Sequence, residues 1–279
     1  MLALLLMSSK CGKEPVPEPP RPEAEQTVYD YAYGSHPQQR MDVYIPYGVR
    51  DTMALIVMVH GGSWYGGDRS MFSPWFEYER AQQRFALINV DYRLDTPETA
   101  PIPMQTDDIA AAIEAVRRDF HLPAKRIAMA GGSAGGHLAT YYAYKYDTQH
   151  DVKVVIDYVG PVDFTDPQYH TPGHWSWIFS GIEYIFGVPY EGHEDYYREV
   201  SPYYHVSAQS PPTIMFYGGQ DTLVPYTQGE RLHRRLDEFQ VENQYYFYPN
   251  SGHIFNREDG LDAFNKAEIF MLQHLRNAQ

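Results

Sequence analysis

Short segments that are apolar on both faces recur along this chain and alternate with helix-like stretches. A buried parallel strand needs such continuous apolarity, because helices cover both faces of a parallel sheet. Each helix between two strands returns the chain to the sheet through a right-handed crossover. We therefore expect an α/β fold with a mostly parallel central sheet covered by helices on both faces. The apolar segments are residues 54–59, 85–90, 127–130, 152–159 and 213–216, together with 244–248, and the helix-like stretches are 104–118, 137–146, 228–239 and 261–275.

The region before the first apolar segment has a different pattern. Residues 27–31 and 41–45 alternate between apolar and polar side chains, and residues 34–38 separate them with turn-forming residues. Such alternation is typical of half-buried strands, so we expect these two strands to pair at one edge of the sheet. The chain has 279 residues, of which 43% are hydrophobic, and this is enough for one substantial α/β core over residues 27–279.

Composition excludes some function classes. The chain has 22 Lys and Arg against 36 Asp and Glu, a formal net charge of −14, and no basic cluster that could neutralise a row of phosphates. We therefore expect no nucleic-acid partner. The 25 tyrosines would suit a protein that presents flat apolar surfaces to sugars or aromatic ligands, and they would equally suit an ordinary core and surface.

The only cysteine, Cys11, lies between an apolar run at residues 2–7 and a Pro/Glu-rich stretch at residues 14–25. The folded part of the chain therefore lacks a disulfide and a thiol nucleophile. The order of these segments is similar to a bacterial lipoprotein signal, in which the cysteine is lipidated. We interpret residues 1–26 as an export signal and tether, and expect a periplasmic or membrane-anchored lipoprotein, with simple secretion as the alternative.

Residues 165–204 interrupt the alternation of strands and helices with an aromatic-rich stretch that also contains glycine, proline and histidine. An insertion after a strand end often forms a lid over the carboxyl edge of the sheet, where ligands bind in open α/β folds. The alternative is a helical connection docked on the core. The lid hypothesis makes Trp175 and Trp177, together with Trp64, candidate substrate contacts.

The sequence GGSAGG at residues 131–136 follows an apolar segment and precedes a helix-like stretch, so Ser133 is expected at a sharp strand-to-helix turn. A serine nucleophile must be held exposed beside a base and next to donors for the oxyanion that it creates. Gly131 and Gly135 fit the G-x-S-x-G nucleophile elbow, in which larger residues would collide with neighbouring backbone. A flexible Gly/Ser turn is the alternative, so the assignment depends on the other strand ends.

Two of those strand ends supply the parts that a nucleophilic serine needs. The strand ending at Val59 continues as His60-Gly61-Gly62, and consecutive glycines allow backbone N–H groups to point into a cleft. Gly61, Gly62 and the N–H of Ala134 are the candidate oxyanion donors. The second of these strand ends, at residue 217, is followed by a loop that carries Asp221. A carboxylate there could fix the tautomer of an imidazole.

The base is expected on the last loop. His253 follows residues 244–248, and a histidine on a loop behind a strand can reach both the acid and the nucleophile. The resulting chain order Ser133, Asp221, His253 is the order of α/β-hydrolases. Asp163 also follows an expected strand and is the reserve candidate for the acid.

The other histidines near glycine- or proline-rich turns are expected to be structural. His137 lies in the helix after Ser133, so its ring would have to double back to act as the base. His60 is expected to pack beside the glycine turn. His170 and His174 have a helical metal-ligand spacing, but Pro172-Gly173 between them disfavours a regular helix, so we predict no metal site.

Taken together, these motifs resemble the α/β-hydrolase esterases of the hormone-sensitive-lipase and carboxylesterase type, and within them bacterial acetylxylan and feruloyl esterase-like proteins and kynurenine formamidases. The resemblance covers about residues 27–275. It implies an α/β-hydrolase fold, with Ser133 as nucleophile, His253 as general base and acid, and Asp221 as its orienting acid. The motifs are HGGSW at 60–64, VDYRL at 90–94, GGSAGG at 131–136, GQDTLVP at 219–225 and SGHIF at 251–255.

The function implied by this resemblance is a serine carboxylesterase that hydrolyses small acetyl or aromatic acyl esters without a cofactor, with polysaccharide-linked esters among the candidate substrates. The residues following VDYRL depart from the lipase-like pattern, so the resemblance assigns no roles to residues in the loop on the substrate side. Two alternatives stay open. The same triad could serve a formamidase-like amidase, and a hydrolase fold can also carry a non-catalytic binding module.

Overall fold

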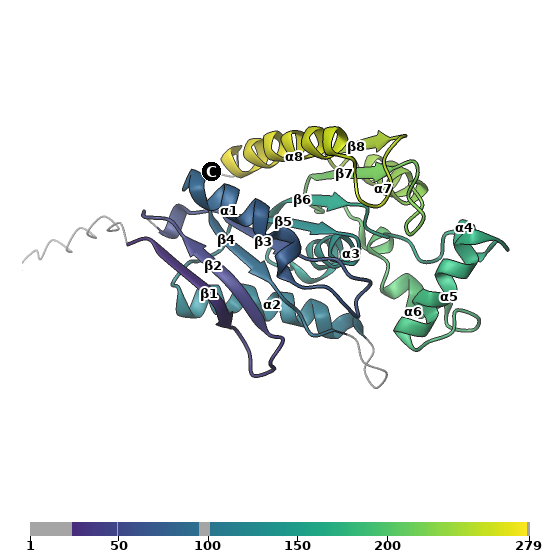
Figure 1. The fold of residues 1–279 in the computed structure, drawn as a ribbon, viewed down its shortest axis with the longest axis horizontal. Coiled ribbons are helices and arrows are strands. Elements are labelled where there is room, and N and C mark those ends of the chain that lie inside the picture. The colour runs from purple at the N-terminus through teal and green to yellow at the C-terminus, as the bar shows by residue number, and fades with distance from the viewer. Residues whose placement is uncertain (1–23, 49, 95–100, 278–279) are drawn as a thin grey trace, which may run out of the picture.

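A computed structural model describes residues 24–48, 50–94 and 101–277 of the chain. Its centre is an 8-stranded sheet with the order β1-β2-β4-β3-β5-β6-β7-β8 (Figure 1). The pairs β1–β2 and β2–β4 are antiparallel, and every later pair is parallel. The mostly parallel sheet with an antiparallel edge is therefore confirmed. The strands are β1 (Gln26–Ala32), β2 (Arg40–Ile45), β3 (Leu55–Val59), β4 (Ala86–Val90), β5 (Ile127–Gly132), β6 (Val152–Tyr158), β7 (Thr213–Gly218) and β8 (Asn243–Tyr248).

The burial of each strand follows its place in the sheet. Every residue of β3, β4 and β7 is buried, whereas the edge strand β1 is mostly exposed. This difference explains why the central strands have continuous apolar sequences and the edge strands alternate.

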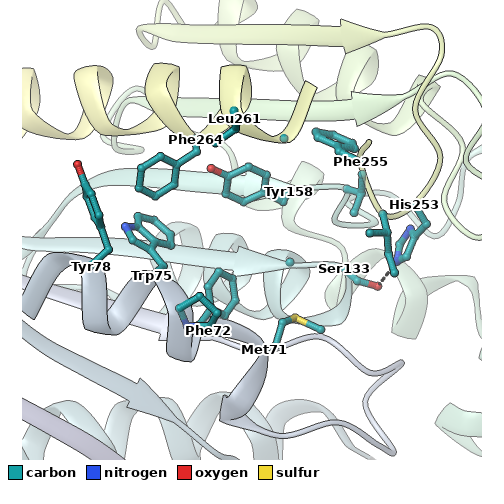
Figure 2. Close-up of a pocket in the computed structure, with 15 residues that line it drawn as sticks. Met71, Phe72, Trp75, Tyr78, Ser133, Tyr158, His253, Phe255, Leu261 and Phe264 are labelled. Carbon is teal, nitrogen blue, oxygen red and sulfur yellow. Dashed lines mark hydrogen bonds between the residues drawn. The ribbon is translucent and has the colours of Figure 1, made fainter. Parts of the chain in front are cut away.

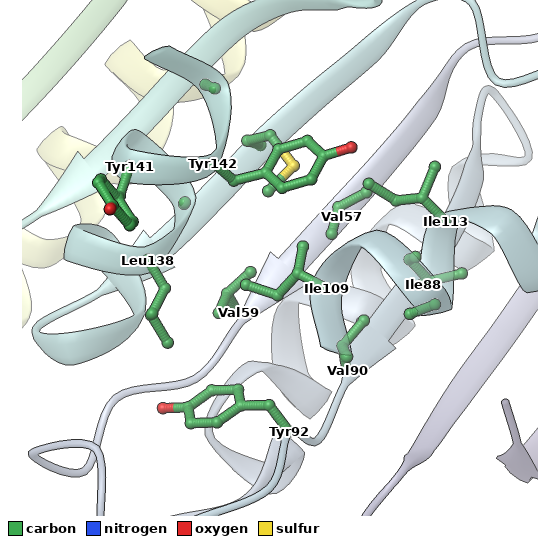
Figure 3. Close-up of a cluster of buried hydrophobic side chains, with 14 of the residues drawn as sticks. Val57, Val59, Ile88, Val90, Tyr92, Ile109, Ile113, Leu138, Tyr141 and Tyr142 are labelled. Carbon is green, nitrogen blue, oxygen red and sulfur yellow. The ribbon is translucent and has the colours of Figure 1, made fainter. Parts of the chain in front are cut away.

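Helices cover both faces of the sheet. On one face, α1 (Ser73–Gln82) and α8 (Arg257–Asn277) pack on a cluster that includes Ile56 and Phe270 (Figure 1). On the other face lie α2 (Pro101–Asp119), α3 (Ala134–Tyr141) and the π-helical turn η3 (Tyr142–Tyr146). Figure 3 shows Ile109 and Ile113 of α2 packed toward the side chains of the central strands.

The last described crossover helix, α7 (Thr227–Glu238), covers the far end of the sheet on the face opposite α8. Along β7, Ile214 and Phe216 belong to the α8 cluster, while Met215 and Tyr217 pack with residues of α7. Alternate side chains of one strand therefore serve both layers, as the two-residue period of a strand requires.

The insertion at residues 165–204 forms α4 (Pro167–His170), α5 (His174–Phe186), α6 (Glu194–Glu199) and the short turn η4 (Pro202–His205). Phe179, Phe186 and Tyr197 are buried in the same cluster as the residues of α2 and α3. This packing corresponds to a helical connection docked on the core. Two further short turns, η1 (Arg50–Thr52) and η2 (Arg69–Phe72), flank β3.

Residues 1–23 of the predicted export signal and tether, including Cys11, lie outside the described residues. Among the helices of the described ranges, none combines the length and apolarity that crossing a membrane requires.

Candidate active site

Ser133 lies at the tip of the turn between β5 and α3. Its backbone has φ 55° and ψ −125°, a conformation that is strained for a residue with a side chain. The glycines around it are sterically required, because a Cβ on Gly131 would lie 2.1 Å from the Gly135 carbonyl oxygen, and one on Gly135 would lie 2.1 Å from the carbonyl oxygen of Val59. The GGSAGG sequence therefore forms the sharp turn that it predicted.

The structure brings the predicted base to this serine. His253 follows β8, and its Nε2 lies 2.9 Å from Ser133 Oγ (Figure 2). Its Nδ1 lies 2.8 Å from Asp221 Oδ2. Because the carboxylate accepts a hydrogen bond from the Nδ1–H, the neutral ring keeps its proton on Nδ1 and presents an unprotonated Nε2 that can accept the serine hydroxyl proton.

Asp221 is held by its own loop. Its Oδ1 accepts the N–H groups of Leu223, at 2.7 Å, and Val224, at 3.0 Å, which leaves Oδ2 for the histidine. The loop itself is tied to the loop of the base, because Gln220 N–H donates to the Ser251 carbonyl at 2.9 Å. Since β7 and β8 are neighbours in the sheet, the acid and the base leave the sheet side by side.

Two of the predicted oxyanion donors, Gly61 and Ala134, lie next to Ser133. A Cβ on Gly61 would lie 3.1 Å from Ser133 Cβ, so the loop after β3 passes directly beside the serine. Gly62 has φ +122°, and its carbonyl accepts the Gly66 N–H at 2.9 Å, which closes this loop. Ala134 is the first residue of α3, so its N–H has no carbonyl one turn earlier within the helix.

One oxyanion donor has a hydrogen-bond acceptor that no sequence motif indicates. The Gly61 N–H donates to the thioether sulfur of Met71 at 3.2 Å. Met71 belongs to η2, and its side chain is 52% exposed.

A cavity of about 650 Å³ opens at Ser133 and runs between α1 and α8 (Figure 2). Its walls are almost entirely apolar and include six Phe, Trp and Tyr rings, so it can desolvate an apolar acyl group next to the serine. The lining residues are Met71, Phe72, Pro74, Trp75, Tyr78, Gly132, Ser133, Tyr158, Val159, His253, Ile254, Phe255, Gly260, Leu261 and Phe264.

The predicted substrate contacts require a correction, because Trp64, Trp175 and Trp177 do not line this cavity. Trp64 is only 4% exposed, and its indole N–H donates to His137 Nδ1 at 3.2 Å inside the core. Trp177 is 72% exposed on α5, and Trp175 packs beside His174. The physical reason is that the insertion is docked on the α2–α3 face, whereas the cavity lies on the α1–α8 face.

Sequence reasoning missed the aromatic wall formed by α1, because it assigned no helix to residues 73–82. A signal was present: Ser73-Pro74 places proline in the first turn of the helix, where its missing N–H costs nothing. The aromatic residues Trp75 and Tyr78 follow at a spacing that places them on one side of a helix.

The reserve acid and the other histidines have separate partners. Asp163 is fully buried and forms an ion pair with Arg231, while its other oxygen accepts the N–H of Thr165 at 2.9 Å. His170 Nε2 lies 2.9 Å from the Phe164 carbonyl oxygen, and His174 Nε2 lies 2.8 Å from that of Thr222. Within the described ranges, no group of three or more His, Cys, Asp or Glu side chains could hold a metal ion.

Two more histidines have structural positions. His137 is fully buried, with Nε2 2.8 Å from the Val200 carbonyl, and burial lowers the pKa of His137 to about 4. The ring is therefore neutral at pH 7 and holds Trp64. His60 stacks on Tyr92 with 4.2 Å between ring centroids, and burial also lowers the pKa of His60.

The buried carboxyl group of Asp157 packs against the start of α3, next to the turn that carries Ser133. Burial raises the pKa of Asp157 to about 7, against the opposing effects of the Tyr217 hydroxyl, which donates at 2.7 Å, and the Gly160 N–H, which donates at 3.0 Å. A Cβ on Gly136 would lie 2.2 Å from Asp157 Oδ1, so this carboxyl packs tightly against the start of α3.

Comparison with known proteins gives a family and a fold. A family model described as BD-FAE matches residues 41–236. The chain is 26% identical to Esterase LipC of Mycobacterium tuberculosis over 82% of its own length, and 24% identical to the acylamino-acid-releasing enzyme of Rattus norvegicus over 79%. It spans 60% of the first and 31% of the second, less than two thirds of either relative.

Solved structures agree on the fold. A truncated carbohydrate esterase from gut microbiota superposes with a TM-score of 0.72 at 20% identity, covering 92% of this chain and 98% of that one. Esterase B from Lactobacillus rhamnosis superposes with a TM-score of 0.67 at 20% identity, covering 91% and 89%. These likenesses confirm the predicted α/β-hydrolase fold.

Proposed function

The chain belongs to the BD-FAE family, and from this premise we propose that it is a serine hydrolase that cleaves carboxylic ester bonds. The observation that carries the proposal is the continuous series of contacts from Ser133 Oγ to His253 Nε2, at 2.9 Å, and from His253 Nδ1 to Asp221 Oδ2, at 2.8 Å. This series opens into a cavity large enough for an acyl group.

The geometry defines the steps. His253 Nε2 accepts the proton of Ser133 Oγ as the oxygen attacks the ester carbonyl, and Asp221 stabilises the resulting imidazolium. The Gly61 and Ala134 amides, with Gly62, receive the oxyanion. His253 then protonates the leaving alcohol. Water hydrolyses the acyl-enzyme after losing a proton to the same Nε2, and the serine is regenerated.

We infer that the acyl group is small or aromatic and enters the α1–α8 cavity. The rings of Phe72, Trp75, Tyr158 and Phe264 offer stacking and edge contacts to a flat acyl group, and few polar atoms line the cavity. Two proteins of similar fold are a carbohydrate esterase from gut microbiota and a bifunctional GH43-CE protein of Bacteroides eggerthii. A polysaccharide-linked ester is therefore our proposal for the substrate.

Activity of Ser133→Ala tests the proposed function. With p-nitrophenyl acetate as substrate, we expect turnover to fall by on the order of a million-fold. Ser180→Ala is the matched control, because Ser180 is exposed on α5 and its hydroxyl donates to the Ser176 carbonyl, away from the cavity; this variant should behave as the wild type. If Ser133→Ala keeps ordinary turnover, the serine hydrolase assignment is wrong. Labelling by a fluorophosphonate probe should follow the same pattern and would exclude a non-catalytic binding module.

The amide-cleaving alternative has one observation in its favour, since one relative is an acylamino-acid-releasing enzyme by name. Ester and amide hydrolysis share the acyl-enzyme chemistry, so only a comparison of substrates distinguishes an esterase from an amidase. We expect higher kcat/KM on acetylated xylan or methyl ferulate than on N-formylkynurenine. The opposite ranking would replace the esterase proposal with the amidase.

We also propose that the chain is exported and anchored through Cys11. The support is the order of apolar run, cysteine and Pro/Glu-rich stretch in residues 1–26. Metabolic labelling with a radioactive fatty acid should mark the wild type and not Cys11→Ser. Equal labelling of both, or of neither, would contradict the anchor.

A further inference from the structure

Met71 lies at the reacting end of the cavity. Its sulfur accepts the Gly61 N–H at 3.2 Å, and Met71 and Ser133 line the same cavity (Figure 2). Gly61 itself is in contact with Ser133, because a Cβ on Gly61 would lie 3.1 Å from Ser133 Cβ and 3.3 Å from Met71 Cε. In the protein without substrate, the thioether therefore occupies an N–H group that the proposed reaction uses for the oxyanion.

The turn that carries Met71 is firmly held. Asp68 caps η2 by accepting the Ser70 N–H at 2.8 Å. Arg69 forms ion pairs with Asp30, at 2.9 Å, with Asp42, at 3.1 Å, and with Asp91. The residue after Met71, Phe72, is buried in the cluster under α1 and α8. Since the chain is held before and after Met71, its flexible side chain is the part that can move away from Gly61 N–H.

The strength of the acceptor decides whether this contact blocks catalysis. A thioether sulfur is a weak hydrogen-bond acceptor, and a substrate carbonyl that becomes an oxyanion is a strong one. The substrate therefore displaces the thioether at little cost. A sulfoxide oxygen on the same side chain would be a polar and much stronger acceptor for the same N–H.

We propose that Met71 is an oxidation site through which hydroperoxides switch off the enzyme. The sulfur attacks one peroxide oxygen, the O–O bond breaks and an S–O bond forms. Sulfur loses two electrons, and the peroxide is reduced to water or an alcohol. The sulfoxide oxygen then holds the Gly61 N–H and competes with the oxyanion. This inference rests on the proposed serine hydrolase function.

Exposure makes Met71 the preferred target among the described methionines. Its side chain is 52% exposed, whereas Met53 and Met104 are half-buried. The remaining described methionines are fully buried in the core: Met41, Met58, Met129, Met215 and Met271. Oxidation depends on access to the sulfur, so Met71 should react first.

The first test compares wild type, Met71→Leu and Met53→Leu, each against its own untreated sample, after graded hydrogen peroxide. We expect wild type and Met53→Leu to lose about 100-fold in turnover when Met71 is fully oxidised, the effect of losing one oxyanion donor. Met71→Leu should keep most of its own activity. Mass spectrometry should place the first added oxygen on Met71, and a methionine sulfoxide reductase should restore wild-type turnover. Equal inactivation of wild type and Met71→Leu would overturn the proposal.

A second readout does not depend on hydrolysis. In proton–nitrogen NMR spectra, the Gly61 amide signal should shift downfield when wild type is oxidised, because its acceptor becomes stronger, and should not respond in oxidised Met71→Leu. If no ester is cleaved but this shift occurs, the proposed function fails while the Met71 contact stands. If esters are cleaved but the Gly61 amide signal does not shift on oxidation, the Met71 proposal alone is wrong.

Discussion

His253 Nδ1 lies 2.8 Å from Asp221 Oδ2, although 32 residues of chain separate them. The contact forms because the two loops follow β7 and β8, which are neighbours in the sheet. The carboxylate uses its other oxygen for the N–H groups of Leu223 and Val224, so its orientation toward the histidine is fixed by its own loop.

Asp221→Asn should retain the fold and lose activity. The amide oxygen can keep the two loop N–H groups, which turns the NH₂ group toward His253 Nδ1 and favours the wrong tautomer of the ring. We expect kcat/KM on p-nitrophenyl acetate to fall by on the order of 10,000-fold, with little change in Tm. Asp163→Asn is the control for the reserve acid. It breaks the ion pair with Arg231, so it should lower Tm and leave kcat nearly unchanged. The reverse pattern would make Asp163 the acid.

Leu261→Trp should narrow the cavity and change acyl specificity. Leu261 lies on α8, lines the cavity and is 55% exposed, so a larger side chain can project across the opening. We expect the ratio of kcat/KM on p-nitrophenyl cinnamate to that on p-nitrophenyl acetate to fall by about tenfold. Trp177→Ala, on the exposed surface of α5, should leave the ratio unchanged. If Trp177→Ala changes the ratio and Leu261→Trp does not, the acyl group binds under the insertion.

Gly135→Ala should destabilise the protein, because its Cβ would lie 2.1 Å from the Val59 carbonyl oxygen and 2.4 Å from that of His60. Backbone atoms cannot rotate away, so we expect a loss of about 2 kcal/mol or more in the free energy of unfolding in urea. Gly181→Ala in α5 meets nothing within 4 Å and should instead gain about 0.5–1 kcal/mol from helix propensity. Similar effects of both substitutions would contradict the close approach at the turn.

Stability should depend on the protonation of His137. Burial lowers its folded-state pKa from 6.5 to about 4, so the unfolded chain binds a proton in this interval that the folded protein does not. The neutral ring makes its full contribution to the free energy of unfolding above pH 6.5. This contribution is lost as the pH falls to 4, which lowers the free energy of unfolding by about 3 kcal/mol. His137→Gln can keep the bonds to Trp64 and Val200. The stability difference between wild type and His137→Gln, measured by urea unfolding, should therefore shrink by this amount from pH 7 to pH 4; a constant difference would show that the ring is not held neutral.

Asp157 should have the opposite pH dependence. Burial raises its folded-state pKa from 3.8 to about 7, so the folded protein binds the proton while the unfolded chain has released it. The stabilisation is complete below pH 3.8 and is lost as the pH rises to about 7. In Asp157→Asn this loss should be absent, because an amide does not titrate, and Tyr217 can turn its hydroxyl toward the Gly160 carbonyl. Parallel pH profiles of wild type and Asp157→Asn would contradict the raised pKa.

The sequence by itself determined the layers of the fold and the order of the site residues. Buried strands such as β3 and β7 have continuous apolar sequences because helices cover both of their faces. The turn at Ser133 is also predictable from local sequence. A side chain on the glycines around Ser133 would collide with nearby backbone, so GGSAGG itself indicates the sharp turn. Asp221 and His253 follow strand ends, and parallel strands deliver their carboxyl ends to one edge.

Only the tertiary structure decided which side of that edge holds the cavity. An aromatic residue signals burial or contact but not the neighbour that it contacts, so Trp64 could be read as a substrate residue although His137 holds it in the core. Trp75 and Phe264 are far apart in the chain and meet only because α1 and α8 cover the same face, with their ring centroids 5.8 Å apart. The contact between Met71 and Gly61 arises in the same way, from a turn packed against a loop, and no local pattern encodes it.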